Sequence, residues 1–290
     1  MNLRPAHTPA TEPYLKGRSF VRSLAFACTL ATVSAPAQES SAQLSDRADR
    51  AAPRTDPNSQ LAHAQLLEKA QHGGIDIYFL GDSIIRRWGA NDYPYFQSNW
   101  KRNFFGWNAA NFGWGADRIQ NILWRVENGE LTGVNPKVIV ILAGTNNVGP
   151  QAADEAKIAD ITRGLQALVN LCRAKAPAAT IVLTAIFPRN DNPAAIPGIN
   201  RINENLARFA DGKSIRFVNI NARLAAADGK LFDGMMGDKL HPTIKGYQIW
   251  ADALNPIFTE LLGPPATTDH APPPTGDPSA TKSRPAPPKP

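Results

Sequence analysis

A series of short apolar runs, alternating with helix-like segments after residue 74, constrains the fold most strongly. Residues 138–143 form the clearest run, a continuous stretch of aliphatic side chains that ends before Gly144. A strand of that composition is typical of a parallel sheet buried on both faces. Strands that alternate with helices in this way indicate βαβ units. The sequence therefore predicts an α/β domain built on a mainly five-stranded parallel sheet.

The expected elements are spread over most of the chain. The predicted strands cover residues 75–80, 107–112, 138–143, 180–187 and 215–220. The predicted helices cover residues 117–128, 152–176, 199–210 and 243–262. In the first of these helices, apolar residues recur at the spacing of one helical face.

The N-terminal segment is predicted to be a signal peptide. Basic residues precede a short apolar run over residues 23–35, and Ala35-Pro36-Ala37 supplies the small residues that a signal peptidase reads. We therefore expect residues 1–37 to be removed after Ala37 and the protein to be exported, either periplasmic or extracellular. The run is too short for a membrane span. An uncleaved anchor and an over-long predicted start are the alternatives, and Cys28 only weakly suggests a lipoprotein site.

Composition divides the rest of the chain into three parts. Residues 38–59 are rich in Ser, Ala, Asp, Arg and Pro and are expected to be a disordered linker. Residues 60–263 have the size of one α/β domain. Residues 264–290 are rich in proline and are expected to be a disordered tail that does not pack.

The charge of the chain argues against nucleic-acid binding. The net charge is +6, but the predicted signal peptide carries +3 of it and the tail +1. The part between them is close to neutral, whereas nucleic-acid binding needs a clustered basic face. Arg86 and Arg87 are therefore interpreted as solvated surface or salt-bridge partners. Cys172 is the one cysteine left after the signal segment and is interpreted as a small core residue.

Ser83 is a candidate nucleophile because of its position. The first predicted strand runs directly into Gly81-Asp82-Ser83. Open α/β sheets bind their ligands at the carboxyl ends of the strands, so this hydroxyl lies at a favourable edge. An activated serine also needs a base, and usually a carboxylate that holds the base.

His241 is the candidate base. His7 and His270 lie in the two terminal segments, and His63 and His72 lie in a polar stretch before the first strand. Among the five histidines, only His241 falls late in the domain.

Asp238 lies three residues before His241, in a loop that leads into the last helix. A carboxylate at that spacing can reach Nδ1 of the imidazole. The alternative is that Asp238 only caps the helix and that the histidine has no task.

Three groups at strand ends are candidate oxyanion donors. They are the backbone N–H of Ser83, the backbone N–H of Gly113 and the side-chain amide of Asn146. Glycine lets the backbone approach a ligand closely. Alternatively, Gly113 and Asn146 are ordinary turn residues.

These segments together resemble the SGNH (GDSL-type) hydrolases. The resemblance rests on Gly81-Asp82-Ser83, Gly113, Gly144-Thr145-Asn146 and Asp238-Lys239-Leu240-His241, and it covers roughly residues 73–262. It implies that Ser83, His241 and Asp238 form a triad and that Ser83, Gly113 and Asn146 form the oxyanion hole. Asn147 stands where many members have Asp, at a position without a catalytic role.

Further segments are similar to the catalytic subunits of intracellular platelet-activating factor acetylhydrolase. They are residues 111–113, 123–131 and 136–140. The resemblance implies a three-layer α/β/α, flavodoxin-like sheet without metal or nucleotide cofactor, and it is compatible with a homodimer.

The residues themselves agree with those expected absences. The chain contains no His-Glu-x-x-His motif and no paired cysteines, so the usual zinc spacing is missing. No Gly-x-Gly-x-x-Gly follows the first strand, and no serine lies in Gly-x-Ser-x-Gly.

The expected activity is hydrolysis of short-chain carboxylic esters, acetyl esters above all. Export favours an acetylated polysaccharide or another small extracellular ester as substrate. Residues just after strand ends are candidates to line the pocket, with core packing as the alternative for the aromatic ones; they are Trp88, Trp114, Phe187 and Arg189. The alternatives are a lipase-like, arylesterase or phospholipid acetylhydrolase activity and, from another class, a non-catalytic extracellular binding or cell-wall attachment module.

Overall fold

The computed structural model describes residues 46–149 and 151–279. All of them belong to one compact unit, Glu39–Pro290. The expected signal peptide over residues 1–37 lies outside the described residues, as do residues 38–45 of the expected linker and residues 280–290 of the expected tail.

Five parallel strands form the sheet of the described chain, in the order β2-β1-β3-β4-β5. They are β1 (Ile77–Gly81), β2 (Ala109–Gly113), β3 (Val138–Leu142), β4 (Thr180–Thr184) and β5 (Ile215–Val218). This strand order is that of the flavodoxin-like doubly wound fold. The predicted fold class is therefore confirmed.

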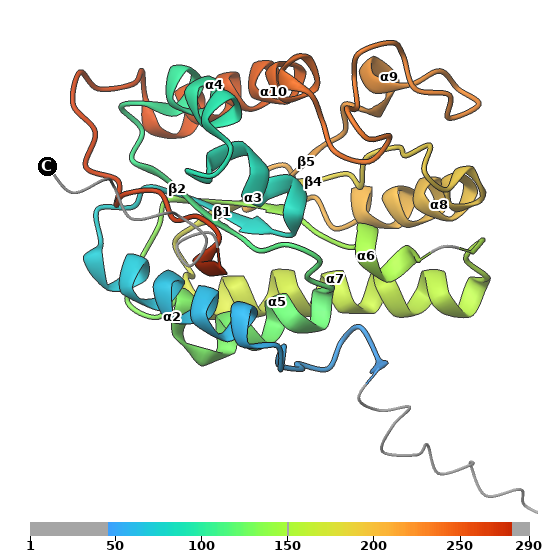
Figure 1. Cartoon of the computed structure of the whole chain (residues 1–290), viewed down its shortest axis with the longest axis horizontal. Helices are drawn as coiled ribbons and strands as arrows, with labels where there is room; N and C mark the ends of the chain where they lie inside the picture. Colours follow the sequence, from blue (N-terminus) through green and yellow to red (C-terminus); the bar gives the residue numbers. More distant parts are fainter. Residues whose placement is uncertain (1–45, 150, 280–290) are drawn as a thin grey trace, which may run out of the picture. The chain divides into compact units, whose positions relative to one another are not determined.

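Helices cover both faces of the sheet, as Figure 1 shows. One face carries α2 (Pro57–His72), α5 (Ile119–Arg125), α7 (Glu155–Lys175) and α8 (Ile196–Ala207). The other face carries α3 (Ser83–Gly89), α4 (Pro94–Phe104) and α10 (Ile244–Leu262). Shorter elements are α6 (Thr145–Val148), α9 (Asn221–Leu224), a π-helical turn (Val126–Glu130) and a 3₁₀ turn (Pro193–Ala195).

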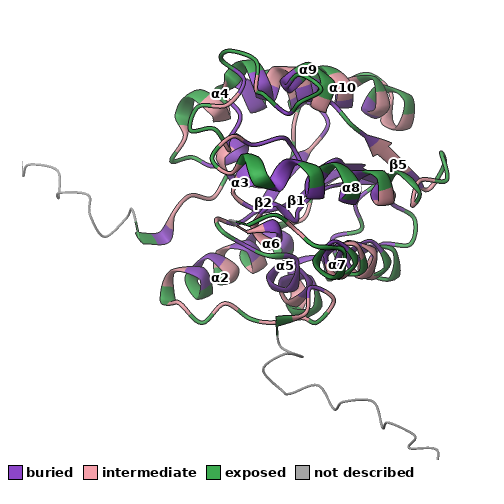
Figure 2. Ribbon diagram, turned by 90° about the vertical axis from the view of Figure 1, so that its right-hand side faces the viewer, coloured by how far each residue is buried: buried purple, intermediate pink, exposed green. Residues whose placement is uncertain are grey.

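Two apolar clusters hold the three layers together, one on each face of the sheet. In β1, Tyr78 and Leu80 belong to the first cluster, whereas Ile77 and Phe79 belong to the second. Figure 2 shows the buried strands between helices whose outer sides are exposed. Successive side chains of a strand point to opposite faces, so a strand covered on both sides must be apolar throughout.

The register brings three strand ends to one place. Gly81, the last residue of β1, pairs with Gly113 at the end of β2 and with Leu142 at the end of β3. β1 lies between β2 and β3, so the order of the strands reverses at β1. The chain passes from β1 to β2 on one side and then places β3 on the other side. Ligands of doubly wound sheets bind in the crevice at such a switch point.

Three of the helices that cover the sheet, α2, α3 and α4, were not expected from the sequence, and neither were the short helices α6 and α9. Helix α2 begins at Pro57, where Asp56 caps it by accepting a hydrogen bond from the Ser59 N–H. His63 and His72 therefore lie on a helix and not in an irregular stretch. Helix α3 is only seven residues long, and α4 has no side-chain cap at its start. The sequence of α4 does contain a helical spacing of apolar residues, at Phe96, Trp100 and Phe104, and this signal was available for prediction.

The expected linker packs against the domain where the structure describes it. Ala48 is fully buried, and its backbone N–H donates to Asp160 at 3.1 Å. The Ala52 N–H donates to the Gln120 carbonyl at 3.0 Å. The expectation of a disordered linker is thus wrong for residues 46–59, because hydrogen bonds supplied by distant segments offset the low apolar content.

The first half of the expected tail also packs against the domain, as the red segment of Figure 1 shows. We call residues 264–279 the C-terminal strap. Its backbone and side chains bond to the loop before β2, to α2 and to the loop after α3, and Pro272 and Pro278 are buried. The expectation that this segment does not pack is wrong for these residues. Proline is already restricted in φ, so an extended proline-rich segment loses little entropy when it is bound.

Candidate functional site

Ser83 occupies the first position of helix α3, directly after β1. Asp82 caps this helix by accepting a hydrogen bond from the Ile84 N–H at 2.9 Å. Gly81 is required before it, because a Cβ there would lie 2.1 Å from the Leu142 carbonyl oxygen. The sharp turn from strand to helix leaves Ser83 partly exposed at the carboxyl edge of the sheet.

His241 reaches Ser83 from the loop that leads into α10. The Ser83 Oγ lies 2.8 Å from Nε2 of His241. On the other side of the ring, Nδ1 lies 2.8 and 3.0 Å from the two carboxylate oxygens of Asp238. A carboxylate can only accept, so Nδ1 carries the proton and Nε2 is free to accept the proton of the Ser83 hydroxyl.

The loop around Asp238 is shaped for this contact. Asp238 Oδ1 also accepts hydrogen bonds from the backbone N–H groups of Leu240 and His241, at 3.2 and 2.8 Å. Lys239, which directly follows Asp238, has a left-handed backbone, with φ at 65°. The carboxylate therefore both turns the loop and faces the imidazole.

A fourth side chain, Arg87 of α3, joins this row of groups. Its Nη1 donates to Asp238 Oδ2 at 3.0 Å. Partial burial opposes ionisation of Asp238, but hydrogen bonds from His241 and Arg87 hold the pKa of Asp238 well below its usual range. The pKa of His241 is lowered by burial and by the cation of Arg87, against the opposing pull of Asp238. His241 is thus neutral at neutral pH, the state that a general base requires.

The candidate oxyanion donors lie at the carboxyl ends of three neighbouring strands. Gly113 ends β2, and a Cβ there would lie 2.4 Å from the backbone nitrogen of Arg86 in α3. Its N–H donates to the Asn111 side chain at 3.0 Å in this structure. Gly113 must therefore exchange that partner before it can donate to a substrate.

Asn146 lies in α6, just after β3. Its Nδ2 donates one hydrogen to the Asp117 carbonyl oxygen at 2.9 Å, which fixes the amide and leaves the second hydrogen for another acceptor. Arg189 holds the same turn from the other side, since its Nη1 donates to the backbone and hydroxyl oxygens of Thr145 at 2.9 Å.

The four residues expected to line the pocket are all buried. Trp88 is fully buried between Tyr247 and Trp250, and Phe187 packs edge-on against Trp250. Trp114 is buried and donates from Nε1 to Ser59 at 2.8 Å. Arg189 is buried and acts on Thr145, as described above. The sequence shows that these residues follow strand ends, but not in which direction their side chains turn.

An open hollow of about 590 Å³ lies beside His241 instead. Its wall includes Arg87, Tyr95, Phe96, Ile244 and Lys245. Tyr95 is 80% exposed and Ile244 is 42% exposed. Tyr95 and Phe96 come from α4, a helix that was not expected from the sequence, so this surface was not expected either.

The described residues contain no cluster of three or more His, Cys, Asp or Glu that could hold a metal ion. Within the same residues, no helix is long and apolar enough to cross a membrane. Cys172 is fully buried in α7, where burial raises its pKa to about 12, as expected for a core residue.

A doubly wound sheet that carries a serine, a histidine and a carboxylate in hydrogen-bond contact at its carboxyl edge places this chain among the three-layer α/β/α hydrolases. The sequence profile of the GDSL-like lipase/acylhydrolase family matches residues 79–249. The chain belongs to this family and is an ester hydrolase of the SGNH/GDSL type, which confirms the resemblance seen in the sequence.

Curated relatives point to the same group. The chain is 32% identical over 202 residues to the alpha1 subunit of platelet-activating factor acetylhydrolase IB from Homo sapiens, covering 69% of this chain and 82% of that protein. It is 30% identical over 189 residues to the alpha2 subunit from Rattus norvegicus, covering 64% and 77% of the two chains.

Solved structures share the fold. A GDSL-like lipase from Bacteroides thetaiotaomicron superposes with a TM-score of 0.54 at 19% identity, covering 70% of this chain and 98% of that one. A member of the lipolytic G-D-S-L family from Veillonella parvula gives 0.52 at 21% identity, covering 64% and 100%.

Proposed function

We propose that this protein is a serine esterase that removes short acyl groups, chiefly acetyl, from an alcohol. The observation that carries the proposal is the contact chain from the Ser83 Oγ through His241 to Asp238, with 2.8 Å at each end. A hydroxyl held against a neutral imidazole whose other nitrogen faces a carboxylate is the arrangement of an activated nucleophile.

The proposed reaction has two halves. The Ser83 Oγ attacks the ester carbonyl carbon while its proton passes to Nε2 of His241. The N–H groups of Ser83 and Gly113 and the amide of Asn146 stabilise the oxyanion. The tetrahedral intermediate collapses, the C–O bond to the alcohol breaks, and His241 returns the proton to the leaving oxygen. In the second half, His241 removes a proton from water while its oxygen attacks the acyl carbon; the bond from that carbon to the Ser83 Oγ then breaks, His241 returns the proton to Oγ, and the acid is released.

The leaving alcohol is proposed to occupy the hollow beside His241. Nε2 must reach both the Ser83 Oγ and the leaving oxygen, so the alcohol departs on the histidine side. The wall there combines Tyr95, Phe96 and Ile244, which suit the flat apolar face of a ring. A sugar hydroxyl in an acetylated carbohydrate fits this wall, and the relatives' name of acetylhydrolase supports the short acyl group.

The decisive experiment compares acyl chains and the nucleophile. Purified protein is expected to hydrolyse p-nitrophenyl acetate much faster than p-nitrophenyl octanoate, and Ser83→Ala is expected to abolish both activities. Full activity in Ser83→Ala would refute the serine-esterase mechanism. Preference for octanoate would instead favour the lipase-like alternative.

A second experiment addresses the alcohol. Acetate release is measured from a panel of acetylated glycans, aryl acetates and an acetylated phospholipid. Tyr95→Ala is expected to raise KM for the preferred class several-fold with little change in kcat, because it removes a ring contact and leaves the triad intact. If KM for every substrate class is the same in Tyr95→Ala as in the wild type, the leaving alcohol binds elsewhere.

We also propose that the protein is exported after cleavage behind Ala37. The proposal rests on the basic, apolar and small-residue order of residues 1–37. Mass spectrometry of the protein from its native cells is expected to find a mature chain that begins at Gln38 in the periplasmic or extracellular fraction. An intact Met1 in the cytosolic fraction would contradict it.

A further inference from the structure

The guanidinium of Arg125 lies buried beneath the strand ends that carry the candidate oxyanion donors. Arg125 is the last residue of α5 and is 4% exposed. Its Nη1 and Nη2 both donate to the Phe112 carbonyl oxygen at 3.1 Å, and Nη2 also lies 3.3 Å from the Gly81 carbonyl oxygen. Phe112 directly precedes Gly113, and Gly81 precedes Ser83 by two residues. One side chain thus ties the end of β1 to the end of β2.

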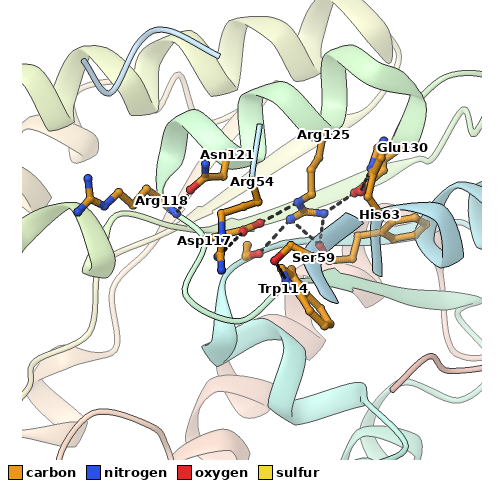
Figure 3. A network of polar contacts seen from close by, with 12 residues as sticks. Arg54, Ser59, His63, Trp114, Asp117, Arg118, Asn121, Arg125 and Glu130 are labelled. Atoms are coloured by element: carbon orange, nitrogen blue, oxygen red, sulfur yellow. Dashed lines mark hydrogen bonds and ion pairs between the residues drawn. The ribbon is translucent and has the colours of Figure 1, made fainter. Parts of the chain in front are cut away.

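The same guanidinium reaches the third donor through Asp117. Its Nε donates to Asp117 Oδ2 at 2.8 Å, and the backbone oxygen of Asp117 accepts the amide of Asn146 at 2.9 Å. Figure 3 shows Arg125 between Asp117 on one side and Glu130 on the other. Arg125 is therefore linked to every segment from which an oxyanion donor is proposed to come.

A purely structural reason for this network is weak. Asp117 and Glu130 are both fully buried, and burying such charges costs several kcal/mol each before their attraction is counted. Apolar side chains of similar volume would often stabilise a fold at least as well. What a guanidinium adds is a rigid planar set of five donors, which can hold several acceptors in fixed directions.

We propose that Arg125 is a positioning residue that sets the geometry of the oxyanion hole. The proposal rests on the proposed serine-esterase function. Arg125 contacts neither Ser83 Oγ nor His241 in the described structure, so it acts through the peptide groups that it holds. Oxyanion stabilisation depends on donors placed within a few tenths of an ångström, and small displacements lower the rate steeply.

The test compares Arg125→Lys with the wild type. Lysine keeps the charge but presents one compact ammonium, which cannot bridge Gly81, Phe112 and both carboxylates at once. We expect kcat for p-nitrophenyl acetate to fall about 10²-fold with KM within about threefold, because the lost contacts matter mainly in the transition state. The rate of inactivation by diethyl p-nitrophenyl phosphate, whose phosphoryl oxygen needs the same donors, is expected to fall in parallel.

Two further variants separate positioning from folding. Asp117→Asn/Arg125→Met/Glu130→Gln removes all three charges together, so that no carboxylate is left buried and unpaired if Arg125→Lys does not fold. The triple variant is expected to show the same decrease in kcat per folded molecule as Arg125→Lys. Leu168→Ala, on the buried face of α7, is the control for stability. It is expected to lower Tm while kcat stays at the wild-type level.

A double variant tests the route of the effect. If Arg125 acts through Asn146 and its neighbours, the fold-decrease in kcat of the double variant Arg125→Lys/Asn146→Ala is smaller than the product of the fold-decreases of the two single variants. Wild-type kcat in folded Arg125→Lys or in the triple variant, or fully multiplicative losses, would overturn the proposal. Failure of the proposed function is distinguishable, since it would appear in the wild-type background as activity that survives Ser83→Ala.

Discussion

His241 is the side chain whose ionisation the rest of the site controls. Burial and Arg87 both disfavour the imidazolium, while Asp238 favours it, and the net effect lowers the pKa. A second cation, Arg189, acts in the same direction as Arg87. The proposed mechanism requires the neutral ring of His241, so we expect activity to be retained down to a lower pH than an ordinary histidine would permit.

This balance predicts a shifted pH profile in Arg87→Gln. Removing a cation makes the imidazolium easier to form, so the pKa of His241 rises and the acidic limb of kcat/KM moves to higher pH. Arg163→Gln, which removes an exposed arginine on α7, is the matched control and is expected to leave the limb in place. If the acidic limb of the kcat/KM profile is unchanged in Arg87→Gln, or moves to lower pH, the role given to Arg87 is contradicted.

Two neighbouring glycines provide a second test at this scale. A Cβ on Gly113 would lie 2.4 Å from the backbone nitrogen of Arg86 and 2.8 Å from the backbone oxygen of Asp82, so α3 and Ser83 would have to move. A Cβ on Gly115 would meet nothing within 4 Å. Gly113→Ala is therefore expected to lose activity at least about 10²-fold and to lower Tm, whereas Gly115→Ala keeps both near wild type. Equal activity in the two variants would refute this steric argument.

At the scale of elements, the five strands and the helices α5, α7, α8 and α10 were predicted from the sequence, whereas α2, α3 and α4, which precede β2, were not. The apolar run 138–143 appears as β3, and the predicted helix 243–262 appears as α10. The predicted helix 117–128 instead divides into α5 and a π-helical turn that contains Gly129 at φ 114°. Helix α3 could not be seen in the sequence, because packing against β1 and β2 stabilises it more than its own seven residues do.

The C-terminal strap is the element whose packing the sequence predicted least well. Thr275 accepts a hydrogen bond from the buried Lys69, and Asp277 accepts one from Asn58, each at 2.9 Å. Burial lowers the pKa of Lys69 to about 7. The strap thus supplies a hydrogen-bond partner to Asn58 and a second one to Lys69, which also donates to the Asn111 carbonyl oxygen at 2.9 Å.

Truncation is expected to reveal this contribution. A chain that ends at Gly263 loses the strap, and we expect its Tm to fall by several degrees, since about 1 kcal/mol corresponds to roughly 2–4 °C for a domain of this size. A chain that ends at Ser279 keeps the strap and is expected to match the full-length protein. The triad lies outside the deleted part, so kcat at 20 °C is expected to stay within about threefold. Identical melting curves for the two truncations would show that the strap adds no stability.

At the scale of the molecule, strand order decides which residues can meet. Gly113 ends β2, and Ser83 and Asn146 come shortly after β1 and β3; these strands are neighbours in the sheet, so the three segments converge at one edge. His241 and Asp238 come from the far end of the chain and reach that edge because α10 packs beside α4 over the same face. The homodimer that the resemblance suggests stays a prediction.

The sequence alone determined the parallel sheet, the family and the five residues proposed for the chemistry, because apolar runs and short motifs are local signals. The tertiary structure decided what depends on distant partners. It turned Trp88 and Phe187 into the core, placed Arg87 on Asp238, put Arg125 beneath the strand ends and bound the C-terminal strap. Each of these outcomes depends on which face a side chain meets and which unpaired donor lies opposite it. Such long-range pairings have no counterpart in a local pattern.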